Sequence, residues 1–131
     1  MPNVFLSHSR RDADLAARVA HELRQLGVEP FDVFASASAG EDLRKTIKDA
    51  IRRADGFVLV VGAPEVTSSS WAGYELGIAE ALAKPVLILL SHNRTASELP
   101  LDMREIPVVP FDPERPERAA REVADRLFAA A

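Results

Sequence analysis

The sequence contains no cysteine among its 131 residues. This absence excludes a disulfide framework, a thiolate nucleophile and a thiolate zinc site. The three histidines, His8, His21 and His92, lie far apart and show none of the spacings typical of metal ligands. We therefore expect no metal centre, and we interpret His8 and His92 as surface or loop residues and His21 as a residue on a helix face.

Long apolar runs and an excess of positive charge are also missing. The longest apolar run, 57–64, is much shorter than the ~20 residues that a membrane-spanning helix needs. The N-terminus has neither the basic nor the apolar region of a signal peptide. Twenty acidic residues against 16 basic ones give a net charge of −4, which argues against a surface that grips nucleic acid. We expect a cytoplasmic chain with no membrane partner and no direct nucleic-acid partner.

The residues that are present describe a globular domain. Hydrophobic residues make up 47% of the chain and charged residues 27%, and a chain of this length buries roughly two-thirds of its unfolded surface on folding. No repeat or linker divides it. We predict a single domain over 1–131, which stands alone or forms part of a longer sensor–effector chain.

Strand-like and helix-like segments alternate along the chain. The segments with the spacing of helices lie at 15–26, which Gly27 closes, at 43–51, at 74–82, and from Asp112-Pro113 to Leu127. The segments with the pattern of strands are 4–7, 28–31, 57–61, 86–90 and a short edge strand at 108–109. This order predicts a flavodoxin-like α/β fold, with a central parallel sheet of five strands and helices on both faces.

Ligands of such sheets bind at the carboxyl ends of the strands. The sequence contains neither the dinucleotide-binding motif GxGxxG nor the P-loop motif GxxxxGK[ST]. The third strand also lacks the terminal aspartate of a response-regulator receiver. The residues available in these loops are Ser7, His8, Ser9 and Arg10 after the first strand, Phe31, Asp32 and Phe34 around the second, and Ser70, Trp71 and Glu75 after the third.

Trp71 and Glu75 are four residues apart and share one face of a helix near its N-terminus. The helix dipole favours a carboxylate there. A carboxylate beside an indole suits a transition state with developing positive charge, because the ring excludes water while the carboxylate stabilises the charge.

Five stretches, in this order, give the chain a resemblance to TIR (Toll/interleukin-1 receptor) domains of the bacterial type. They are VFLSHSRRD, the Gly27 turn, AGEDLRKTIKDAIRRADGFVLVV, SSSWAGYELGIAEALAKPVLIL and LPLDMREIPVVPFD. Two departures stand out: His8 occupies a position where many members have Tyr, and Asp32 is shifted by one residue from the acid that usually follows the second strand.

The resemblance implies an NAD+ glycohydrolase that breaks the nicotinamide N-glycosidic bond, releases ADP-ribose or a cyclic isomer, and takes part in defence or cell-death signalling. It assigns catalysis to Glu75 and substrate contacts to Ser9, Arg10, Phe31 and Trp71. NAD+ is then the substrate, and no cofactor is needed.

The resemblance also implies self-association. The segment corresponding to the family's BB loop would contact a neighbouring TIR domain, and assembly, directed by a fused or separate sensor, would activate the enzyme. The residues of this segment are Ala35, Ser36, Ala37, Ser38, Ala39 and Gly40.

Two other functions fit the same residues. The chain could be a non-catalytic adaptor that works through TIR–TIR contacts. The segment from Tyr74 to Val86 also resembles nucleoside 2-deoxyribosyltransferases, which break N-glycosidic bonds with a Glu. Each assigned residue has a plain structural role as its alternative: Glu75 and Arg10 as solvated charges, Trp71 and Phe31 as packing residues, and Ser9 as a helix cap.

Overall fold

The computed structural model describes residues 2–32, 42–62, 71–99, 103 and 105–128. The strands are β1 (Asn3–His8), β2 (Glu29–Phe31), β3 (Gly56–Val61), β4 (Val86–Ser91) and β5 (Val108–Phe111). The α-helices are α1 (Ala13–Gln25), α3 (Leu43–Arg53), α4 (Trp71–Ala81) and α5 (Pro116–Val123). Short helical turns are η1 (Arg10–Asp12), η2 (Ala96–Glu98) and the π-helical η4 (Ala124–Phe128).

The five strands form one parallel sheet in the order β2-β1-β3-β4-β5. The predicted flavodoxin-like α/β architecture is therefore confirmed, and β5 lies at an edge as expected. The order reverses between β1 and β3, since the chain leaves β1 toward one edge and returns at β3 toward the other. The carboxyl ends of these two strands form the switch point at which such sheets bind ligands.

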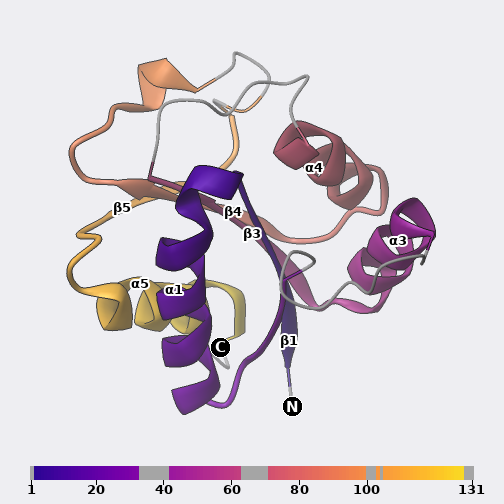
Figure 1. Cartoon of the computed structure of the whole chain (residues 1–131), viewed down its shortest axis with the longest axis horizontal. Helices are drawn as coiled ribbons and strands as arrows, with labels where there is room; N and C mark the ends of the chain where they lie inside the picture. The colour runs from indigo at the N-terminus through magenta and orange to yellow at the C-terminus, as the bar shows by residue number, and fades with distance from the viewer. Residues whose placement is uncertain (1, 33–41, 63–70, 100–102, 104, 129–131) are drawn as a thin grey trace.

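Helices cover both faces of the sheet (Figure 1). Alternate residues of each strand point to opposite faces, so the strands contribute to two separate cores. On one face α1 and α5 pack over Val4, Leu6, Val58 and Val60. On the other, α3 and α4 pack over residues that include Phe5, Phe57, Leu59 and Ile88.

Rings from three neighbouring strands line up on the α3 and α4 face. Phe5 stacks on Phe57 with ring centroids 5.5 Å apart, and Phe31 packs on the other side of Phe5 at 5.7 Å. Ser7 is the next residue of β1 on the same face, because it lies two positions after Phe5. The polar end of β1 therefore follows directly after this row of rings on the same face of the sheet.

Two features of α4 and α1 bear on the sequence predictions. Gly27 follows α1 with a φ of +80°, as expected for a residue that ends a helix in the left-handed conformation. In α4 the buried positions are Ala72, Glu75, Leu76 and Ala79, whereas Leu82, the last residue of the predicted segment 74–82, follows the helix and is 41% exposed. Ala72 and Ala79 belong to the core on this face, and Glu75 lies on the same buried side of α4.

The last helix begins later than the Asp112-Pro113 signal predicts. The carboxylate of Asp112 accepts a hydrogen bond from the Glu114 amide at 2.9 Å, and its carbonyl accepts one from the Arg115 amide. Asp112 therefore closes a turn, and Pro116 is the first residue of α5. The polar residues at 67–70, whose side chains are suited to cap the N-terminus of α4, lie outside the described residues.

Candidate active site

Glu75 is the central group of the candidate site. It projects from α4 toward the carboxyl end of β1 and is 1% exposed. The hydroxyl of Ser7 donates a hydrogen bond to Oε1 of Glu75 at 2.7 Å. Among the residues that the structure describes, Oε2 of Glu75 has no hydrogen-bond partner. One oxygen is thus held by Ser7, and the other is buried without a partner among the described residues.

The electrostatic environment of Glu75 places its ionisation in the neutral range. Burial raises its pKa from 4.5 to about 7, since a charged carboxylate loses its hydration inside the protein. The Ser7 hydrogen bond and the charge of His8 lower the pKa, and the charge of Asp32 raises it. A carboxyl that titrates near neutrality inside a sheet-end site is typical of functional groups.

His8, the last residue of β1, is also 1% exposed, so its interpretation as a surface or loop residue is wrong. Its Nε2 lies 2.7 Å from Oδ2 of Asp32, which follows β2, and its Nδ1 lies 2.7 Å from the carbonyl oxygen of Ser9. The β1 strand ends one residue later than predicted, and its last residue, His8, is buried. His21 and His92 are exposed, as predicted.

Asp12 fixes the loop that follows β1. Its buried carboxylate accepts hydrogen bonds from the Gly62 amide at 3.0 Å and from the Ser9 hydroxyl at 3.3 Å. A Cβ on Gly62 would lie 2.8 Å from both Asp12 Oδ1 and Leu15 Cδ2, so any larger residue there would displace one of these side chains. The end of β3 is thereby held against η1 at the switch point.

The remaining predicted substrate residues are spread around this centre. Ser9 is half-buried and binds Asp12, and Arg10 is exposed on η1. Trp71 is the first residue of α4, one turn before Glu75. Whether these residues contact a substrate stays a prediction. The predicted loop segment 35–40 lies outside the described residues.

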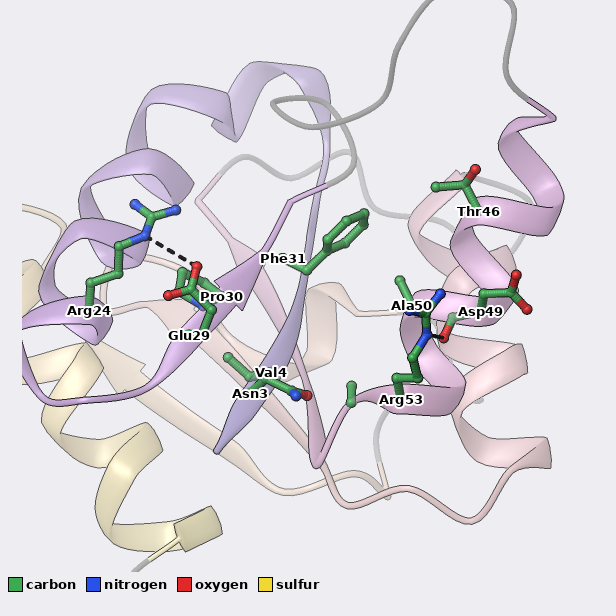
Figure 2. A pocket seen from close by; sticks show the side chains of 11 residues that line it. Asn3, Val4, Arg24, Glu29, Pro30, Phe31, Thr46, Asp49, Ala50 and Arg53 are labelled. Atoms are coloured by element: carbon green, nitrogen blue, oxygen red, sulfur yellow. Dashed lines mark hydrogen bonds and ion pairs between the residues drawn. The ribbon is translucent and has the colours of Figure 1, made fainter. Parts of the chain in front are cut away.

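Phe31 lines a separate groove beside the edge strand β2. The groove has a volume of about 490 Å³ and runs between β2 and α3, where Thr46 and Ala50 face Phe31 (Figure 2). An ion pair between Arg24 and Glu29, 3.7 Å long, lies at its other side (Figure 2). Glu75 does not line this groove. Phe31 and Asp32 are nevertheless consecutive, so the end of β2 reaches the groove with one residue and His8 with the next.

Sequence reasoning listed Ser7, His8 and Asp32 at the strand ends but assigned none of them to the site. The available signal was their position: each lies at the carboxyl end of β1 or β2, next to the switch point. In the described part of the chain, no group of three or more His, Asp or Glu side chains could hold a metal ion. The same described residues include no helix long and apolar enough to cross a membrane.

Comparison with known proteins places the chain in a family. A family model for the TIR domain matches residues 4–127. A comparison of the sequence with curated proteins finds no match.

Several solved structures share the fold. The TIR domain of the Toll-related receptor TRR-2 from Hydra magnipapillata is 16% identical with a TM-score of 0.71, and the match covers 94% of this chain and 91% of that one. TIR domains of the activated Roq1 resistosome are 20% identical with a TM-score of 0.62; the match covers 74% of this chain and 61% of that longer one. The CMP N-glycosidase BcmB of Clostridium botulinum is 18% identical with a TM-score of 0.58 over 92% of this chain and 97% of that one. At these identities the likeness concerns the fold.

Proposed function

Because the chain is a member of the TIR domain family, we propose that it is an NAD+ glycohydrolase whose catalytic residue is Glu75. The observation that carries this proposal is the carboxylate itself. Glu75 is buried at the switch point, Ser7 holds one of its oxygens, and among the described residues the other has no partner. A carboxylate held in this way is prepared to act on a group that develops positive charge.

The reaction needs little more than such a carboxylate. The bond between ribose C1′ and the nicotinamide nitrogen breaks, and its electron pair stays on nicotinamide, which leaves as a neutral base. No strong general acid is required, because the leaving group starts as a cation. The ribosyl centre becomes oxocarbenium-like, and Oε2 of Glu75 stabilises its charge or binds a ribose hydroxyl. Water adds at C1′ and releases a proton, so NAD+ and water give nicotinamide, ADP-ribose and a proton.

Self-association is the second part of the proposal. Glu75 is 1% exposed in the single chain, so a substrate reaches it only after neighbouring groups move aside. Contacts with a second TIR domain, through the segment 35–40, would supply this movement. One of the similar structures is of TIR domains in an activated resistosome, an assembled state. We therefore expect activity to rise with protein concentration.

A second candidate is cleavage of the N-glycosidic bond of a nucleotide or deoxynucleoside. The fold similarity to the CMP N-glycosidase favours it, and so does the same chemistry at C1′, because Glu75 could stabilise a ribosyl cation whatever the leaving base. The proposal of NAD+ as the substrate is supported by the TIR family match, which the nucleotide alternative lacks.

A substrate panel with matched variants tests the proposal. The purified chain, dilute and then concentrated with a crowding agent, is incubated with NAD+, CMP and deoxynucleosides, and the released bases are measured by chromatography. Glu75→Gln is compared with Glu80→Gln, an exposed glutamate of the same helix. We expect nicotinamide release from wild type and Glu80→Gln and none from Glu75→Gln. Release of cytosine or another base with NAD+ intact would favour the second candidate, and inactivity of the concentrated chain on every substrate would favour an adaptor.

A further inference from the structure

His8 is buried, with both ring nitrogens on acceptors. A carbonyl oxygen accepts hydrogen bonds and cannot donate them, so the 2.7 Å contact with Ser9 requires a proton on Nδ1. The 2.7 Å contact between Nε2 and the Asp32 carboxylate requires a second proton there when Asp32 is ionised. Together the two contacts favour the imidazolium form of His8, paired with an Asp32 side chain that is itself only 14% exposed.

Groups of the described residues act on His8 from at least three elements. Asp32 follows β2, the Ser9 carbonyl follows β1, and the charge of Glu75 acts from α4. Asp12, the other buried acid of this region, binds Ser9 and the Gly62 amide. Burial alone lowers the pKa of His8, but the hydrogen bond to Asp32, the one to Ser9 and the charges of Asp32 and Glu75 outweigh it and raise the pKa overall.

His8 and Glu75 are linked through the end of β1. Ser7 donates to Glu75, and the next residue, His8, binds the end of β2. A positive charge near a buried carboxylate favours its ionised form. In this chain the charge of His8 opposes the burial that raises the pKa of Glu75.

We propose that His8 is a positioning residue of this site: as an imidazolium buried between Asp32 and the Ser9 carbonyl, it ties the end of β2 to the end of β1 and favours the carboxylate form of Glu75. The catalytic consequence rests on the function proposed for Glu75. The charge relationship between the two side chains does not, and it can be measured without any substrate.

The direct test is a titration by NMR. Protein with labelled glutamate carboxyl carbons is titrated as wild type, His8→Gln and His92→Gln, and the Glu75 signal is assigned from its loss in Glu75→Gln. His92 is a matched control because its ring is exposed and lies 4.0 Å from Asp112, at a different strand end. We expect the Glu75 midpoint to move to higher pH in His8→Gln and to stay unchanged in His92→Gln. An unchanged midpoint in folded His8→Gln would overturn the proposal.

A second measurement serves if His8→Gln does not fold. The nitrogen signals of labelled imidazole report directly whether both ring nitrogens carry protons. In the wild type we expect His8 to be doubly protonated at neutral pH, and in Asp32→Asn we expect its titration to move to lower pH. A neutral single tautomer of His8 in the wild type at neutral pH would also overturn the proposal.

The two proposals fail separately. If Glu75→Gln loses nicotinamide release but the Glu75 titration ignores His8, the catalytic assignment stands and the role of His8 is wrong. If no N-glycoside is cleaved but the Glu75 midpoint responds to His8, the role of His8 stands and the catalytic assignment of Glu75 is wrong. Where activity is present, we expect His8→Gln to lose more of it below about pH 7 than above, by roughly tenfold for each unit of midpoint shift.

Discussion

The hydroxyl of Ser7, near the end of β1, donates a 2.7 Å hydrogen bond to Oε1 of Glu75, which is 68 residues away on α4. This contact joins the first strand of the chain to the helix that follows the third. It crosses the point where the strand order of the sheet reverses, and it leaves Oε2 of Glu75 as the oxygen without a partner among the described residues.

Removal of this hydroxyl should weaken both the fold and the proposed activity. Ser7→Ala leaves Oε1 of Glu75 buried without its donor, which costs about 1–3 kcal/mol in the free energy of unfolding. It also raises the pKa of Glu75 further, because the lost hydrogen bond favours the carboxylate. We expect kcat for nicotinamide release to fall more than KM changes, and Ser7→Cys, with a weaker donor, to lie between. Equal rates and melting temperatures in all three proteins would contradict the role of Ser7.

The pH dependence of stability tests the buried state of Glu75 without a substrate. Its pKa is raised to about 7 in the folded protein from the ordinary 4.5, so between these values the folded state binds more protons than the unfolded state. The contribution of Glu75 to stability therefore falls as pH rises from about 4.5 to 7, by on the order of 3 kcal/mol. The raised pKa of His8 adds a loss of the same sign, which begins near its ordinary value of 6.5 and continues through its folded value.

Urea unfolding of wild type, Glu75→Gln and Glu80→Gln across this pH range measures the effect. The difference between wild type and Glu75→Gln reports Glu75 together with its charge coupling to His8, because the remaining titrating groups are shared. We expect Glu75→Gln to lose less stability with rising pH and Glu80→Gln to follow the wild type. Parallel curves for wild type and Glu75→Gln would mean that Glu75 is not desolvated.

Two glycines provide opposite outcomes for the same substitution. Gly62→Ala places a Cβ 2.8 Å from Asp12 Oδ1 and Leu15 Cδ2, whereas a Cβ on Gly77 meets nothing within 4 Å. We expect Gly62→Ala to destabilise the protein by about 1–3 kcal/mol, and Gly77→Ala, at an exposed position of α4, to stabilise it by about 0.5–1 kcal/mol. Thermal melts of both variants decide this, and a neutral Gly62→Ala would show that η1 and the end of β3 are not packed as described.

Substitution of Phe31 can show whether its ring contacts the substrate or only packs in the core. Phe31→Leu keeps much of the apolar volume against Phe5 but removes the ring that lines the groove. If the ring packs against substrate, KM for NAD+ rises in Phe31→Leu while the melting temperature changes little. Phe111→Leu, buried in β5 on the other face, should show the reverse. A normal KM in Phe31→Leu would limit Phe31 to the core.

The fold was predictable because its signals are local. Buried strands such as 57–61 are apolar at every position, and Gly27 marks a helix end that needs a positive φ. The exact ends of the helices and strands were harder to predict. Asp112 offers both a helix cap and a turn, and its hydrogen bonds with Glu114 and Arg115 decide for the turn.

The site was predictable only in part, because its partners are distant in sequence. Glu75 could be singled out from its spacing to Trp71, but its burial depends on Ala72 and Ala79, which let α4 approach the sheet. A histidine in the motif Ser7-His8-Ser9 resembles a loop residue until Asp32, 24 positions later, is found against its ring. No local sequence pattern predicts such a pair, because it forms only where the strand order places the ends of β1 and β2 side by side.

Nicotinamide release from NAD+ by the concentrated protein, compared between wild type, Glu75→Gln and Glu80→Gln, decides whether Glu75 is catalytic. We expect release by the wild type and by Glu80→Gln, and a fall of at least about 100-fold in folded Glu75→Gln. We also expect the wild-type rate to rise with pH through about 7, as Glu75 ionises. Undiminished release by folded Glu75→Gln would show that Glu75 is not the catalytic residue.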